Sequence, residues 1–379
     1  MSSIAGDMNV MGFLRSDGLV GLRNLVLVVS LSDLTNDVAN SLVWSHPSAR
    51  CLLAPTGGLS FGQELAFTTR LFGQLCHNPN VGTVVILGTD RKAAECFAEN
   101  ACRDGCEHEI FITQDWPDTN ALFRKASSVV AGMAARLASS IRKSFDLSCL
   151  RVGLRSSNTS RQSSLTVHPA ASLMVSSLVD AGSTVAFSEI ADLAGDPEAA
   201  SATIAPKHLK ASVRGVIQEA RTILTGLGSD APDPTPVNRH GGIETLASKT
   251  AAAMRRVQGT KIASLQKYGD TLPRGGLHLI DGPGSAWMSL LGFAASGCTI
   301  VLQTVGANSF TASFPLLTSV ILAGDELADS SDVDLMTRGQ EFDVFSSLRK
   351  LSAVASGTLA AAEEMRSKVA MLPNWQPPI

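Results

Sequence analysis

Seven short apolar runs constrain the fold of this chain more than any other feature. The runs are rich in Val, Ile and Leu and do not alternate with polar residues, which is typical of strands that are covered on both faces of a sheet. They are Asn24–Ser30, Thr83–Leu87, Arg151–Leu154, Thr184–Phe187, Gly276–Ile280, Thr299–Leu302 and Ser319–Leu322. Stretches with helical periodicity lie between them. The sequence therefore predicts an α/β fold with two βα-rich lobes and mainly parallel, helix-covered sheets.

The clearest helical pattern runs from Asn120 to Ser144, with Thr119 as the expected N-cap. Its apolar residues recur every four positions and predict one buried stripe, formed by Val129, Met133, Leu137 and Ile141. Further helices are predicted at Phe61–Cys76, Pro169–Ala181, Ala211–Leu227, Ile243–Val257 and Glu341–Met371.

We place a domain boundary near residue 146. This divides the chain into an N-terminal α/β domain, residues 1–146, and a C-terminal α/β domain, residues 147–379. A polar, Pro-rich stretch, Gly228–His240, lies inside the second domain. We interpret it as a long active-site loop, because its flanks are too regular for a simple flexible linker.

Composition excludes several classes of protein. The 379 residues carry a net charge of −3, and only 5% of them are aromatic, which argues against a nucleic-acid-binding protein or a membrane-surface protein. The N-terminus does not resemble a signal peptide, and the longest apolar runs are too short to span a bilayer, so we expect a cytoplasmic protein. The seven cysteines form no disulfide framework. Cys102, Cys106 and His108 could suggest a metal site, but the end of an amphipathic helix explains them better.

The predicted strands end in polar, Gly-rich loops. Because ligands bind at the carboxyl ends of parallel strands, these loops indicate a site for a small, polar, anionic molecule, although such residues also simply close turns. The loops begin at Ser30, Gly88, Arg155, Ser188, Asp281 and Thr304. No nucleotide fingerprint is present, since the Gly-Pro-Gly at residues 282–284 lacks a third glycine and no P-loop occurs.

Eight segments of the chain resemble segments of the altronate and galactarate dehydratase family. They follow one another in the same order as in the family. The segments are 12–24 (GFLRSDGLVGLRN), 53–58 (LAPTGG), 77–88 (HNPNVGTVVILG), 150–172, 179–195, 234–250 (PTPVNRHGGIETLASKT), 268–284 (YGDTLPRGGLHLIDGPG) and 298–309 (CTIVLQTVGANS). Each motif alone is weak, but together they cover roughly residues 10–340. The chain is therefore identified as similar to this family.

The resemblance implies a lyase that acts on a small hydroxy-carboxylate, such as a sugar acid. The expected reaction is a β-elimination of water. Expulsion of sulfite, as in a related sulfolactate sulfo-lyase branch, is an open alternative. Such a reaction needs a cationic site for the carboxylate, a base, and an acid or metal at the leaving group. The resemblance also implies that the chain starts at the dehydratase core, so we expect a separate small subunit, together with a homo-oligomer.

The chain departs from the family at three cysteine motifs. Gly57-Gly58-Leu59, Thr89-Asp90-Arg91 and Arg155-Ser156-Ser157-Asn158-Thr159 stand where the family usually has cysteines. The family's dependence on ferrous iron makes those thiols natural ligands. Their loss speaks against a family-type iron site, so the sequence leaves the cofactor open. It also leaves open a non-catalytic or regulatory subunit, and a metal-independent lyase or isomerase.

Candidate site residues follow from charge, position and the resemblance. The catalytic candidates are Lys249, His240 and Glu244, with Lys249 or His240 taking the proton. Arg15 and Arg23 flank a Gly-rich turn and are expected to bind the carboxylate. The other candidates for substrate binding are Asn24, Thr56, Asn238, Gly241, Gly242, Thr245, Asp281, Thr304 and Asn308.

Overall fold

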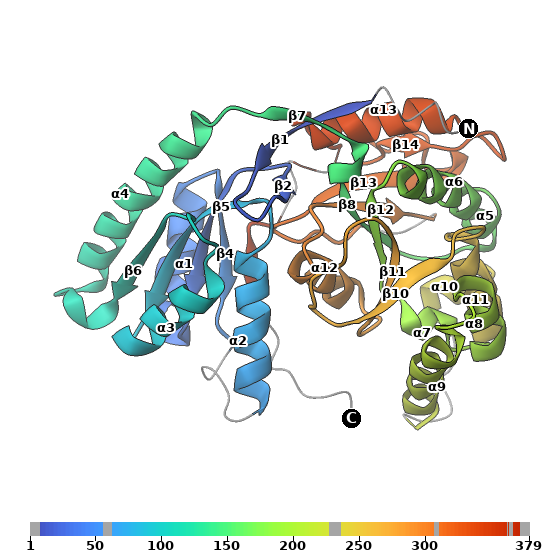
Figure 1. The fold of residues 1–379 in the computed structure, drawn as a ribbon, viewed down its shortest axis with the longest axis horizontal. Coiled ribbons are helices and arrows are strands. Elements are labelled where there is room, and N and C mark those ends of the chain that lie inside the picture. Colours follow the sequence, from blue (N-terminus) through green and yellow to red (C-terminus); the bar gives the residue numbers. More distant parts are fainter. Residues whose placement is uncertain are drawn as a thin grey trace.

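The computed structural model describes residues 8–55, 63–226, 236–306, 311–361, 363 and 367–371. The described chain forms two lobes that lie side by side, each built on a parallel sheet (Figure 1). A small antiparallel sheet, of order β2-β1-β7, runs along one side of both lobes. Its strands are β1 (Asn9–Leu14), β2 (Val20–Gly21) and β7 (Lys143–Asp146). The predicted α/β class with two βα-rich lobes is therefore confirmed.

The first lobe contains a five-stranded parallel sheet of order β15-β4-β3-β5-β6. The strands are β3 (Leu25–Ser30), β4 (Ala49–Leu53), β5 (Val81–Gly88), β6 (His108–Ile112) and β15 (Val369–Met371). Its helices are α1 (Asn36–Ser45), α2 (Gln63–Cys76), α3 (Arg91–Ala101) and α4 (Thr119–Ala138). Residues of α1 and α4 pack on one face of the sheet, and those of α2 and α3 pack on the other.

The second lobe contains a seven-stranded parallel sheet of order β10-β11-β9-β8-β12-β13-β14. The strands are β8 (Arg151–Ser156), β9 (Thr184–Phe187), β10 (Ile262–Lys267), β11 (Gly276–Asp281), β12 (Ile300–Thr304), β13 (Thr318–Ala323) and β14 (Leu335–Met336). The helices are α5 (Arg161–Leu165), α6 (Val167–Asp180), α7 (Ile190–Leu193), α8 (Pro197–Ile204), α9 (Lys210–Gly226), α10 (Pro236–His240), α11 (Leu246–Arg255), α12 (Ala286–Ala295) and α13 (Val344–Ala355).

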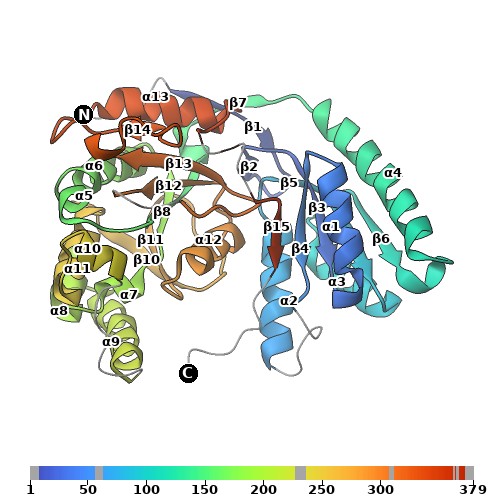
Figure 2. The same cartoon turned by 180° about the vertical axis from the view of Figure 1, so that it is seen from behind.

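The lobes share one apolar core. Side chains of α2 and α3 pack in the same cluster as side chains of α12, which covers the face of the second sheet opposite α6. Asn80 ties this contact together, because its amide donates to the carbonyl oxygens of Thr299 and Leu316 and its Oδ1 accepts from the backbone of Leu22 and Arg23. The final strand β15 returns to the first lobe and pairs with β4, as Figure 2 shows from behind. The position of the domain boundary stays a prediction.

All seven apolar runs are strands, with ends within two residues of the expected ones. Two helix predictions were wrong in extent. The helix expected to reach Ser144 ends at Ala138, and β7 follows because its residues pair with β1. As a result Ile141 is exposed, and the buried stripe is Leu122, Ala126, Val130 and Met133. The helix expected over Glu341–Met371 is α13 alone, followed by the segment that leads to β15. Within the described residues, no helix has the length and apolar character needed to cross a bilayer.

Candidate active site

The carboxyl ends of the strands in the second lobe bring polar residues from different loops together. Strand β8 ends at Ser156 and its neighbour β12 ends at Thr304, while Ser188 and Glu189 follow the neighbour on the other side, β9. Because all three strands are parallel, these residues share one edge of the sheet, where open α/β sheets bind their ligands.

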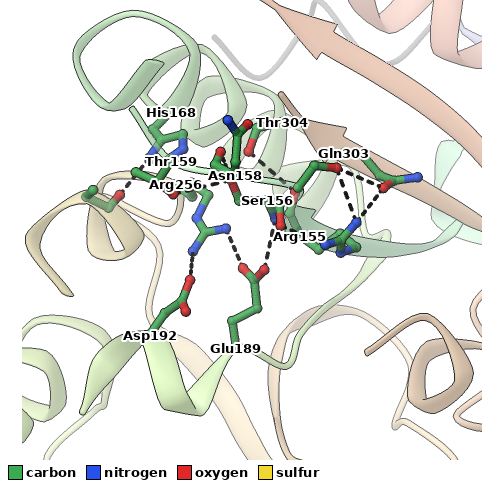
Figure 3. Close-up of polar contacts among 12 residues, drawn as sticks. Arg155, Ser156, Asn158, Thr159, His168, Glu189, Asp192, Arg256, Gln303 and Thr304 are labelled. Carbon is green, nitrogen blue, oxygen red and sulfur yellow. Dashed lines mark hydrogen bonds and ion pairs between the residues drawn. The ribbon is translucent and has the colours of Figure 1, made fainter. Parts of the chain in front are cut away.

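The loop after β8 is held in place by hydrogen bonds to two other loops (Figure 3). The Ser156 hydroxyl donates to the carbonyl oxygen of Asn158 at 2.7 Å, and Asn158 Oδ1 accepts from the backbone of Gly306 at 2.9 Å. The backbone N–H of Thr159 donates to Asn238 Oδ1 at 2.9 Å. The next residue, Ser160, caps α5. The loop therefore has a defined shape, set by polar side chains that are themselves buried.

Five charged side chains form a cluster at this edge, which we call the charged cluster: Arg155, Glu189, Asp192, Lys249 and Arg256. Arg256 is fully buried and donates from Nη1 to Glu189 Oε2 and from Nη2 to Asp192 Oδ2, the latter at 3.3 Å. Lys249 Nζ lies 2.7 Å from Asp192 Oδ1. Glu189 Oε1 accepts from the backbone of Ser156 at 3.0 Å, which joins the cluster to the loop after β8. Figure 3 shows Glu189 between Arg256 and Ser156.

Arg155 lies on β8 and is only 2% exposed. Its Nη1 donates to Gln303 Oε1 on the neighbouring strand at 2.7 Å, and its Nη2 donates to the carbonyl oxygen of Ser156 at 2.8 Å. Its Nε is buried and has no hydrogen-bond partner among the described residues. Arg155 therefore has no carboxylate bonded to it, unlike Arg256.

The charged cluster has more positive than negative groups. Its three basic side chains face two carboxylates, so one positive charge is in excess when all five are ionised. A buried charge without a partner is costly, and an anionic group bound at this edge would balance it. The arrangement therefore suits a ligand with a carboxylate.

The two carboxyl groups of the cluster differ in their pKa. Burial raises the pKa of Glu189 above its usual value, despite the nearby Arg256. Burial would raise the pKa of Asp192 as well, but Lys249 and Arg256 outweigh that effect and lower it. Burial, with the charge of Arg256, lowers the pKa of His168 to about 3, so this imidazole is neutral. Its Nδ1 pairs with the carbonyl oxygen of Ala252 at 2.8 Å. Opposite pKa shifts in adjacent carboxyls are typical of sites that transfer protons.

Five predicted site residues lie around the loop after β8. Asn238 binds Thr159, and the Gly241 carbonyl oxygen accepts from the backbone of Arg161 at 2.7 Å. Thr304 accepts from the backbone of Ser157 at 2.9 Å through its carbonyl oxygen. Gly242 adopts a φ of 82°, a left-handed conformation that favours glycine, in the turn next to Gly241. Lys249 belongs to the charged cluster.

Arg15, Arg23 and Asn24 lie elsewhere and hold backbone in place. Arg15 donates to the carbonyl oxygens of Pro79 and Arg23. Arg23 forms a two-point ion pair with Glu363 and also donates to three carbonyl oxygens. The Asn24 amide donates to the Leu137 carbonyl oxygen at 3.1 Å. Of these three residues only Arg23 bonds residues of the second lobe, and the structure brings none of them to the charged cluster.

The remaining predicted residues fall into three groups. His240, Glu244 and Thr245 are exposed, and Thr245 caps α11 in a capping box with Ser248. Asp281 ends β11 at the same edge of the sheet but two strands away from β8, and its side chain is exposed. Thr56 and Asn308 lie outside the described residues, as do residues 228–235, the first eight of the stretch interpreted as an active-site loop.

Both lobes match protein families of known members. The family described as D-galactarate/Altronate dehydratase, C-terminal, matches residues 147–376, which is more than half of the chain. The chain belongs to this family. The family described as D-galactarate dehydratase/Altronate hydrolase, second domain, matches residues 12–138. The resemblance inferred from the motifs is therefore confirmed.

Three relatives have similar levels of identity. The altronate dehydratase of Bacillus subtilis is 23% identical over 79% of this chain, which spans 62% of that protein. The (2R)-sulfolactate sulfo-lyase subunit beta of Chromohalobacter salexigens is 24% identical over 90% of this chain and 87% of its own length. The altronate dehydratase of Escherichia coli is 22% identical over 86% of this chain and 68% of its own length. This member of the dehydratase family thus matches relatives of two different names to a comparable degree.

The described residues do not fit the ferrous iron that the family resemblance implies. In the part of the chain that the structure describes, no group of three or more His, Cys, Asp and Glu side chains could hold a metal ion. Where the family has a cysteine in the loop after β8, this chain has Arg155, and the two carboxylates nearby are bonded to Arg256 and Lys249. A divalent cation would add to the excess positive charge, so we derive no step through a metal.

Sequence reasoning did not assign Glu189, Asp192, Arg256 or Arg155 to the site. Two features of the sequence indicated two of these residues: Glu189 follows a predicted strand, and Arg155 begins a motif that departs from the family. Asp192 and Arg256 had no such signal, because they meet only through the packing of α7 against the end of α11. The charged cluster that these residues form becomes visible only in three dimensions.

Proposed function

We propose that this chain is a lyase that acts on a small hydroxy-carboxylate by β-elimination. One observation carries the proposal: a buried charged cluster with one excess positive charge lies at the ligand-binding edge of a sheet in a member of this family. The excess charge favours a carboxylate, and the family supplies the expectation of a sugar-acid lyase.

The reaction has a fixed balance of bonds and protons. A base removes the proton on the carbon next to the carboxylate, and its electron pair forms a C=C bond as the C–O bond on the next carbon breaks. The hydroxyl leaves with a proton as water, and the enol product rearranges to a 2-keto-3-deoxy acid. Negative charge develops beside the carboxylate in the transition state, which fixed cations stabilise. Arg155 and Arg256 are the fixed cations of this site.

Lys249 is the member of the cluster that is most suited to contact the substrate, since its side chain is 18% exposed whereas that of Arg256 is fully buried. In its ion pair with Asp192 it is an ammonium group, which can donate a proton to the leaving hydroxyl. His240, on the exposed end of α10 before α11, is then the candidate base. Glu244, exposed between these helices, and Asp281, exposed at the end of β11, are proposed to position the substrate.

One comparison favours a second candidate reaction on the same site. The match to the sulfo-lyase subunit beta covers 87% of the length of that protein, and the name of that protein indicates a further subunit. Expulsion of sulfite uses the same proton abstraction with a C–S bond in place of the C–O bond. The separate small subunit is proposed on this basis. The homo-oligomer stays a prediction.

The proposal is tested with purified full-length chain and three acids: altronate, galactarate and (2R)-sulfolactate. Formation of keto acid or sulfite is measured for the wild type, for Lys249→Met, and for Lys350→Met as a control, because Lys350 is exposed on α13 in the same lobe. We expect turnover of one acid by the wild type and the control, and a loss of about 100-fold or more in kcat for Lys249→Met. Full activity of Lys249→Met, or no turnover of any acid by the wild type, would contradict the proposal.

A further inference from the structure

A polar cavity lies at the edge of the seven-stranded sheet opposite the charged cluster. It has a volume of about 540 Å³ and is bordered by the first residues of β8 and β9, by the residues before β11, and by the turn between β1 and β2. The polar residues that line it are Asp146, Ser148, Arg151, Thr184 and Arg274. Strand β8 spans from Arg151 in this cavity to Ser156 at the candidate active site, about 16 Å at the usual rise per residue. The cavity is therefore separate from that site.

Two guanidinium groups line the cavity without a carboxylate bonded to either. Arg151 is 3% exposed. Its Nε donates to the carbonyl oxygen of Gly297, and its Nη2 donates to two further backbone carbonyl oxygens. Its Nη1 has no hydrogen-bond partner among the described residues. Arg274 uses only Nη2, at 3.1 Å from the Gly18 carbonyl oxygen and 3.5 Å from that of Asp17. Burial lowers the pKa of Arg151, and the positive charge of Arg274 lowers it further. An anion between them would relieve this repulsion.

The same cavity also contains an acceptor. Asp146 Oδ1 accepts from the backbone and hydroxyl of Ser148, and no partner of Oδ2 is found among the described residues. The other nearby carboxylate, Asp17, accepts from the backbone of Leu19 through Oδ1 and lies on the turn, outside the cavity lining. A cavity lined by two cations and by a carboxylate suits a ligand that carries both a carboxylate and a hydroxyl group.

We propose that this cavity is a second binding site for a small hydroxy-carboxylate. Arg151 Nη1 and Arg274 bind the carboxylate, and Asp146 accepts from a hydroxyl group. The volume falls in the range of small-molecule sites. The turn that carries Gly18 and the strand β7 that carries Asp146 belong to the antiparallel sheet between the lobes. A ligand in this cavity therefore contacts both that sheet and the second lobe, and it stabilises their junction by mass action.

The test uses gluconate as the probe and isothermal titration calorimetry of the full chain. Four proteins are compared: the wild type, Arg274→Gln, the exposed control Arg338→Gln, and Lys249→Met, which separates this cavity from the candidate active site. Arg274 is chosen because it is exposed and bonds only the turn, so its loss leaves the core intact, whereas replacement of Arg151 would leave three carbonyl oxygens without a donor.

We expect the wild type to show a binding event of millimolar or better affinity that survives Arg338→Gln and Lys249→Met, whereas any gluconate that binds at the charged cluster is lost in Lys249→Met. Arg274→Gln is expected to weaken this event about tenfold or more, since a hydrogen bond to a charged group is lost. The thermal midpoint should rise with gluconate in the wild type and rise less in Arg274→Gln. Absence of saturable binding, or binding that Arg274→Gln leaves unchanged, would overturn the proposal. Because binding is measured without turnover, these outcomes are independent of the proposed lyase activity.

Discussion

Replacement of Arg256 by Met probes the charged cluster most sharply. The guanidinium is fully buried, bonds both Glu189 and Asp192, and lies 5.4 Å from the centroid of the Phe187 ring. Met fills much of the same space but cannot donate. In Arg256→Met, Asp192 keeps Lys249 as its partner at 2.7 Å, whereas Glu189 keeps only the backbone N–H of Ser156.

The cost of this change follows from what is left unpaired. Removal of one partner from a buried ion pair costs about 3–5 kcal/mol, because the other charge stays buried. We expect Arg256→Met to lower the free energy of unfolding by about 3 kcal/mol, the lower end of this range. Only Glu189 loses its main partner, and the Glu189 carboxylate can take up a proton instead. Glu189→Gln in the Arg256→Met background should then recover about half of the loss, because the amide carries no charge to bury.

The assay is urea unfolding at pH 7, followed by circular dichroism, in a double-mutant cycle of Arg256→Met and Glu189→Gln. Arg255→Met is the matched control, since the neighbouring Arg255 is only partly buried and makes one hydrogen bond, to the Ser164 hydroxyl. The control should lose about 1 kcal/mol or less. A loss below about 1 kcal/mol for Arg256→Met, or no coupling between the two sites, would refute the idea that the cluster depends on its ion pairs.

Two further changes test the surroundings of the site and the junction of the lobes. His168 has a folded pKa of about 3 against about 6.5 when unfolded, so only the unfolded chain binds its proton between these values. The free energy of unfolding should therefore fall by roughly 1.4 kcal/mol per unit as the pH drops below about 6, and His168→Gln should lack this contribution when unfolding is compared at pH 7 and pH 5. A parallel pH dependence of the two proteins would contradict it. Asn80→Ala removes four hydrogen bonds, two of which connect the lobes, and should cost about 3 kcal/mol or more in thermal unfolding. A change within about 0.5 kcal/mol would show that these bonds contribute nothing net.

The apolar strands could be predicted because each is buried on both faces and must be apolar along its length. Strand β10 was missed, since its edge position leaves Ser264 and Gln266 only partly buried and breaks the apolar run. Strand β15 was missed because three residues carry too little pattern, and it exists only through pairing with β4. Local patterns therefore predicted most interior strands of the two parallel sheets but missed the interior strand β4, and they predicted none of the strands at the edges of these sheets.

The site was predictable in place but only partly in composition. The rule that ligands bind at strand ends led to Thr304 and to the loop after β8, and the motifs led to Asn238 and Lys249. The partners of Lys249 were not predictable, because Asp192 lies 57 positions earlier in the chain and meets it through tertiary packing. Arg23 carried the right charge for a carboxylate site, but in the structure it is paired with Glu363, 340 positions later, which no local pattern could predict.

The central claim is that the charged cluster supports elimination from a hydroxy-carboxylate. The most direct measurement is keto acid or sulfite formation by chelator-treated wild-type protein, with the metal content measured in the same sample. We expect this metal-depleted protein to turn over one of the three acids and Lys249→Met to turn over none. Turnover that appears only when ferrous iron is restored, with about one iron bound per chain as for a structured metal site, would contradict it.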